Sequence, residues 1–143
     1  MPEVLHQFVI EAAPDVVWPF FATPSGLDKW WTERAEGETA PDAVWELFFT
    51  PEYDWRARVT RCEKDTAFEL TMLEAMDDWI GTRVGVEICG GGGRTVIDFY
   101  HRGWAANTDH FRISSFCWAT YLRLLKRHIE HGEFTMYGQR DYV

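Results

Sequence analysis

His101 is the side chain in this sequence whose position most suggests acid–base chemistry. It ends the segment 95–101, where alternation places residues 95, 97, 99 and 101 on one apolar face of a strand. A neutral imidazole on that face can act as a general base or can orient a polar group of a ligand. The alternative is a partly buried histidine that hydrogen-bonds the backbone or a hydroxyl such as Ser114 or Tyr121. This structural role is favoured, because catalysis requires a second placed group that the sequence does not identify.

Other chemistry-bearing residues give weaker signals. His128 and His131 stand three apart, a helical spacing that can hold a metal, but no third ligand is evident. We therefore expect no metal and no cofactor. Asp77 and Asp78 lie in a turn that is expected near the mouth of a cavity between the long helix and the sheet. We interpret them as solvated carboxylates. The glycines of 90–93 join two alternating strands, so they indicate a hairpin turn rather than a phosphate loop.

Composition and charge exclude several classes of partner. The chain has 143 residues, which predicts one domain, and a net charge of −9, which disfavours nucleic acid and anionic membrane surfaces. No apolar run is long enough to span a membrane. The three cysteines, Cys62, Cys89 and Cys117, are too few and too widely spaced for a disulfide framework, and they fit a reducing cytoplasm.

The elements that must position these side chains are organised around one long helix. Helical periodicity runs from Asn107 to Glu133, with Asn107 or Thr108 able to cap its start and Gly132 able to end it. The apolar stripe of this helix, with its flanking polar residues, comprises Phe111, Ser114, Ser115, Trp118, Tyr121, Leu122, Leu125 and Ile129.

The remainder of the chain predicts a sheet. Leu5–Glu11 is expected as a first strand, followed by a helix from Pro14 that kinks or ends at Pro19, and by a second short helix over Ser25–Trp31. The polar stretch Glu33–Ala43 indicates a loop. Five further strands are expected over Val44–Thr50, Trp55–Cys62, Ala67–Leu73, Thr82–Cys89 and Thr95–Arg102. An α+β fold follows, in which a curved antiparallel sheet of about six strands wraps around the long C-terminal helix, with two short helices after the first strand.

Three segments of the chain carry a resemblance to a known family. The opening segment follows a pattern in Ile10, Ala13, Pro14, Val17, Trp18, Thr23, Pro24, Trp30 and Trp31. The end of the sheet follows another in Thr95, Ile97, Phe99, His101, Gly103 and Trp104. The last helix follows a third in Trp118, Leu122, Leu125, Lys126, Glu130 and Gly132. Together they resemble the SRPBCC, or START-related, superfamily, in the branch named after the activator of the heat-shock-protein-ninety ATPase.

The resemblance implies a helix-grip fold, similar to the birch pollen allergen, formed by a single domain over residues 1–143. Members of this superfamily hold apolar ligands between the last helix and the sheet, and some are polyketide cyclases or aromatases. Met72 is similar in position to a residue that faces the cavity in relatives. The chain departs from the pattern at Pro19 and at Asp42–Val44, where the family often has two glycines, so the loop Thr32–Asp42 is the least determined part.

The aromatic content of 16% fits either a lined cavity or a core of large side chains. We predict an apolar cavity in which Trp31 packs as plain core and His101 and Ser114 supply polar anchors. The residues expected to contact a ligand are Trp55, Met72, Trp79, Phe99, His101, Phe111, Ser114, Trp118 and Tyr121.

Three functional hypotheses follow from this cavity. The first is binding of a hydrophobic small molecule, lipid-like or polyketide-like, without catalysis. The second is a cyclase or aromatase that uses His101. The third is a protein-interaction module with a chaperone partner, and a homodimer through an exposed sheet edge is compatible with all three.

Overall fold

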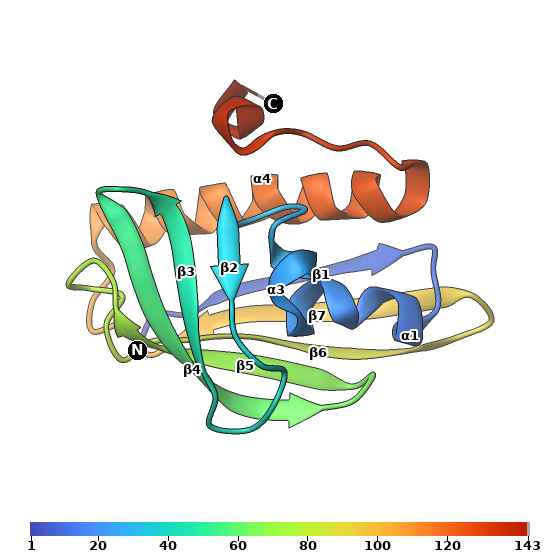
Figure 1. The fold of residues 1–143 in the computed structure, drawn as a ribbon, viewed down its shortest axis with the longest axis horizontal. Coiled ribbons are helices and arrows are strands. Elements are labelled where there is room, and N and C mark those ends of the chain that lie inside the picture. Colours follow the sequence, from blue (N-terminus) through green and yellow to red (C-terminus); the bar gives the residue numbers. More distant parts are fainter. Residues whose placement is uncertain (143) are drawn as a thin grey trace.

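The computed structural model describes residues 1–142 and has the helix-grip architecture. Its elements in chain order are β1 (Val4–Ile10), α1 (Pro14–Val17), α2 (Pro19–Ala22), α3 (Pro24–Leu27), β2 (Arg34–Glu36), β3 (Val44–Thr50), β4 (Tyr53–Glu63), β5 (Ala67–Glu74), β6 (Arg83–Gly91), β7 (Arg94–Arg102), α4 (Asp109–His131) and the 3₁₀ helix η1 (Tyr137–Tyr142). Helix α4 crosses one face of the sheet, and the C-terminal segment turns back and runs over it (Figure 1). Across residues 1–142, no helix combines the length and the apolar character that a bilayer crossing requires.

The sheet is antiparallel throughout and has the order β1-β7-β6-β5-β4-β3-β2. The sequence predicted about six strands, and the seventh is β2, which lies within the stretch expected to be a loop. Only Ala35 of its three residues is buried, and its amide donates to the carboxylate of Asp28 at 2.8 Å. Such a short, polar edge strand has almost no apolar alternation, so periodicity could not reveal it.

The predicted break at Pro19 is confirmed. Helix α1 ends at Val17 and α2 begins with Pro19 in its first turn, where a missing N–H costs nothing. A third short helix, α3, follows, and the hydroxyl of Thr23 caps it by accepting from the Gly26 amide at 3.0 Å. Three short helices therefore stand where two were expected.

The long helix has the predicted caps. The side chain of Thr108 accepts from the amide of Phe111 at 3.1 Å, and Gly132 ends the helix in the left-handed conformation at φ 70°. The helix buries Trp118, Leu122 and Leu125 of the predicted stripe against the sheet.

Irregularities interrupt the pairing of β3 with β4 and of β4 with β5. The pairing of β4 with β5 shifts register between Arg56 and Ala57 and again between Val59 and Arg61, and β3 shifts between Phe48 and Thr50. Each bulge bends its strand and increases the local twist. Figure 1 shows β3 and β4 rising beside the first half of α4.

The face of the sheet turned away from α4 carries one buried polar contact. The Tyr100 hydroxyl donates to Glu69 Oε2 at 2.6 Å, and burial, followed by the adjacent Glu69, raises the pKa of Tyr100. The ring of Tyr100 lies over Gly85, its cross-strand partner, and a Cβ at Gly85 would lie 2.4 Å from the ring. Glycine is thus required in β6 to leave room for the tyrosine.

We predict that Gly85→Ala lowers the free energy of unfolding by about 1–3 kcal/mol, because the methyl group displaces Tyr100 from Glu69. Chemical denaturation followed by circular dichroism measures this change. Gly91→Ala is the matched control in the same strand, since its Cβ would meet nothing within 4 Å. Equal stabilities of the two variants would contradict the prediction.

Candidate functional site

A directional chain of buried hydrogen bonds links α4 to the sheet. The indole N–H of Trp118 donates to His101 Nδ1 at 3.1 Å, so the proton of a neutral ring resides on Nε2. That nitrogen lies 2.8 Å from Thr82 Oγ1, to which it donates, and the Thr82 hydroxyl donates to the carbonyl of Trp79 at 2.5 Å. The hydroxyl that partners His101 is therefore Thr82, whereas the sequence suggested Ser114 or Tyr121.

The environment of His101 keeps its ring neutral. The residue is 0% exposed, and burial, followed by electrostatic repulsion from His110 when that ring is protonated, lowers the pKa of His101 to about 3. A protonated Nδ1 would also direct its N–H at the N–H of Trp118. Because both nitrogens are engaged within the core, the geometry gives His101 a structural role.

Trp79 extends this chain back to the helix. Its indole N–H donates to Ser114 Oγ at 3.2 Å, and its ring stacks on Trp118 with centroids 5.8 Å apart and planes inclined by 20°. Trp79 belongs to the connection between β5 and β6, so the contacts fasten that connection to α4. The polar atoms of Trp79 and Trp118 are thereby paired, which frees their ring faces to form an apolar wall.

A hollow of about 260 Å³ opens beside this wall, and we call it the inner hollow. It lies between the first half of α4, the β3–β4 hairpin, the connection after β5 and the C-terminal segment. Its lining comprises Trp31, Phe49, Tyr53, Trp55, Met76, Trp79, His110, Ile113, Ser114, Cys117, Trp118, Tyr121 and Tyr137. An aromatic lining with a few polar atoms is the usual character of a site for an apolar small molecule.

The structure divides the predicted ligand contacts into two groups. Those that line the inner hollow are Trp55, Trp79, Ser114, Trp118 and Tyr121. Those that lie in the packing around it are Met72, Phe99, His101 and Phe111. The ring of Phe99 packs against Trp118 at 4.8 Å, and Phe111 packs against Trp104 at 5.2 Å.

Several lining residues were not among the predicted contacts. His110, Ile113 and Cys117 precede Tyr121 at helical spacing, so the periodicity of that face of α4 could have identified them. Trp31 was expected to be plain core. Tyr53, Phe49 and Met76 come from turns and strand ends, and Tyr137 comes from beyond the helix, where no periodic signal exists.

Tyr137 is brought to the hollow by a buried arginine. Arg140 is 1% exposed and donates to three backbone carbonyls, those of Asp28 at 2.8 Å, Thr32 at 3.2 Å and Thr135 at 3.0 Å. The bonds to Asp28 and Thr32 hold the C-terminal segment against the connection that follows α3, and the bond to Thr135 lies within the segment itself. The ring of Tyr137 then packs near Phe49, at 6.1 Å, and closes one side of the inner hollow.

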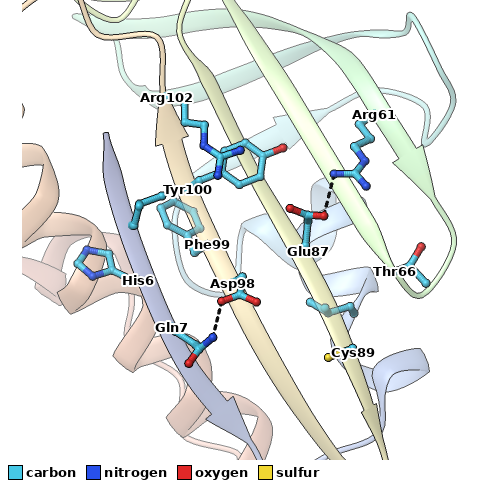
Figure 2. A pocket seen from close by; sticks show the side chains of 12 residues that line it. His6, Gln7, Arg61, Thr66, Glu87, Cys89, Asp98, Phe99, Tyr100 and Arg102 are labelled. Atoms are coloured by element: carbon cyan, nitrogen blue, oxygen red, sulfur yellow. Dashed lines mark hydrogen bonds and ion pairs between the residues drawn. The ribbon is translucent and has the colours of Figure 1, made fainter. Parts of the chain in front are cut away.

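A larger depression of about 640 Å³, the outer hollow, lies on the opposite face of the sheet (Figure 2). Four of its charged and polar side chains form two pairs: Gln7 donates to Asp98 at 2.7 Å, and Arg61 lies 3.3 Å from Glu87 (Figure 2). Such pairing leaves little net attraction for a ligand. The smaller inner hollow therefore has the stronger claim as a binding site, since its walls are apolar and converge.

Known proteins share both the sequence pattern and the architecture of this chain. The family model of activator of Hsp90 ATPase homolog 1-like proteins matches residues 11–130. None of the curated proteins compared with this chain matches it. The Aha1 dimer from Colwellia psychrerythraea is 24% identical, with a TM-score of 0.82 over 93% of this chain and 99% of that chain.

Two other solved structures show the same fold at lower identity. Protein MLL2253 from Mesorhizobium loti is 12% identical, with a TM-score of 0.81 over 93% of this chain and 100% of its own. CalU16 from Micromonospora echinospora is 15% identical, with a TM-score of 0.70 over 98% of this chain and 83% of its own.

We predict that the protein loses stability as the pH falls below about 6.5. The unfolded chain takes up a proton on His101 between its ordinary pKa and about 3, whereas the folded chain does not. Stability from the neutral ring is therefore complete above pH 6.5, and it declines by at most about 1.4 kcal/mol per pH unit towards pH 3. Urea denaturation at a series of pH values measures this slope.

His101→Gln is the comparison variant for that slope. It removes the titrating group, so its stability should depend less steeply on pH between 6.5 and 3, although it is less stable at pH 7. An imidazole NMR titration of the unaltered protein provides the second check. Protonation of His101 near pH 6 would contradict the prediction.

Proposed function

The chain belongs to the family of activator of Hsp90 ATPase homolog 1-like proteins, and from this premise we propose that it binds an apolar small molecule in the inner hollow. The observation that carries the proposal is the lining: the side chains of Trp31, Trp55, Trp79 and Trp118 border one space beside the gripped helix. The indole N–H groups of Trp79 and Trp118 are already bonded within the protein. The surface offered to a ligand is therefore mainly apolar.

The volume of the inner hollow restricts the class of ligand. Ligand sites commonly span roughly 300–1,000 Å³, so about 260 Å³ lies at the small end. A long-chain lipid would not fit within it. A flat, mostly aromatic molecule of about two fused rings fits both the volume and the ring-lined walls, so of the two classes considered from the sequence we favour the polyketide-like one.

The alternative functions have less support. A cyclase that uses His101 lacks a geometric basis, because the ring is fully buried and both its nitrogens have partners. A chaperone partner would rest on the family name alone, and a shared fold does not carry a partner with it.

Cys117→Phe should weaken binding of 2-methoxynaphthalene at least tenfold, because the added ring occupies the inner hollow. Equilibrium dialysis measures the affinity, and native mass spectrometry of freshly purified protein detects any ligand that co-purifies. Cys89→Phe is the matched control, since Cys89 lines the outer hollow. Circular dichroism melting verifies that both variants fold.

The two substitutions also decide which hollow is used. Weakening by Cys89→Phe together with unchanged affinity in Cys117→Phe would transfer the site to the outer hollow. Absence of binding to the unaltered protein, with no co-purified ligand, would overturn the proposed function.

We also propose a homodimer, because the Colwellia psychrerythraea relative is described as a dimer. The edge of β1 is partly covered, since Lys126 Nζ donates to the Val9 carbonyl and Glu130 accepts from the Glu11 amide. An edge-to-edge dimer would therefore favour β2, the other edge of the sheet. Sedimentation equilibrium should give a mass near twice that of the chain at micromolar concentration, and a single-chain mass would count against the dimer.

A further inference from the structure

We propose that His110, held in place by Asp78, is the polar recognition group of the inner hollow and accepts a hydrogen bond from a phenol or enol hydroxyl of the ligand. This inference rests on the proposed function and specifies the class of molecule that the hollow takes. The sequence singled out His101, which is buried and has both ring nitrogens engaged. His110 is partly exposed and lines the inner hollow.

The orientation of the His110 imidazole is set by Asp78. Its Nδ1 lies 2.7 Å from Asp78 Oδ1. A carboxylate can only accept, so Nδ1 carries the proton and donates it. Thr108, the cap of α4, donates to the other oxygen of Asp78 at 3.4 Å. The ring also stacks on Trp79, with centroids 6.1 Å apart and planes inclined by 23°, so its position is set from two sides.

The remaining nitrogen of His110 is available to a ligand. Among the side chains that the structure describes, those of residues 1–140, none hydrogen-bonds His110 Nε2; the side chain of His110 is 29% exposed and borders the inner hollow. With Nδ1 protonated by its contact with Asp78, a neutral ring presents the lone pair of Nε2 as an acceptor. His101, by contrast, has both nitrogens engaged and no exposed surface.

The charges around His110 favour a neutral ligand. Asp78 contacts His110, Asp77 precedes Asp78 in the chain, Asp109 precedes His110, and the protein carries a net charge of −9. A carboxylate or sulfonate on the ligand would approach this group of acidic residues at an electrostatic cost. A neutral hydroxyl avoids that cost and supplies the donor that Nε2 lacks. The aromatic walls then accommodate the ring system that carries the hydroxyl.

A pair of matched probes tests this inference. 2-Naphthol and 2-methoxynaphthalene share one ring system, but only the naphthol can donate a hydrogen bond. Equilibrium dialysis at a pH where the naphthol is neutral should show that the unaltered protein binds 2-naphthol about fivefold more tightly. His110→Phe, which keeps an aromatic ring beside Trp79, should bring this ratio to about one.

Two further variants separate recognition from a merely structural effect. His131→Phe makes the same substitution at an exposed position of α4 outside the hollow and should retain the preference. Asp78→Ala should reduce the preference, because the ring loses the acceptor that fixes its tautomer and orientation. A loss of packing alone would weaken both probes equally and leave their ratio unchanged.

The possible results distinguish failure of the inference about His110 from failure of the proposed function. If both probes bind but His110→Phe retains the fivefold preference, the inference about His110 is wrong and the proposed function stands. If the unaltered protein binds both probes equally, the inference is again overturned. If neither probe binds, the proposed function fails and the inference fails with it. Loss of the preference in His110→Phe, with His131→Phe unaffected, supports both.

Discussion

The hydrogen-bond chain from Trp118 through His101 and Thr82 to the carbonyl of Trp79 determines how the rest of this structure is arranged. Apolar burial attracts α4 to the sheet, but it has no direction and cannot set the rotation of a helix. A buried indole N–H does have direction, because leaving it or its acceptor unpaired costs about 1–3 kcal/mol. Trp118 is therefore held with its N–H towards β7, and one side of its ring becomes a wall of the inner hollow.

The same interaction explains why a pocket persists in a protein so rich in large side chains. Rings that could have collapsed into the inner hollow are restrained by polar atoms bonded elsewhere, Trp79 to Ser114 and Trp118 to His101. Filling the space would require breaking those bonds. The cavity is thus compatible with a dense core, because specific polar contacts offset the loss of some packing.

The sequence predicted the elements whose causes are local. The caps at Thr108 and Gly132, the break at Pro19 and the strands that alternate around 90–93 all depend on residues a few positions apart. It missed β2 and the approach of Tyr137, because these depend on Asp28 and Arg140, which act across the fold. Among the ligand contacts, alternation identified the face that carries His101 but could not tell which part of that face is packed. The helical spacing between His110 and Tyr121 could have placed His110 at the hollow, but no local pattern reveals its contact with Asp78, which stands 32 residues earlier in the chain.

The buried guanidinium of Arg140 affects how often the C-terminal segment moves away from the inner hollow, as well as where that segment lies. Its contacts with the carbonyls of Asp28 and Thr32 hold Tyr137 against the inner hollow, so that wall retreats only when both break together. Opening is then an infrequent, cooperative event rather than a continuous fluctuation. The lifetime of any molecule enclosed there would be governed by this fastening, independently of how well the aromatic walls fit it.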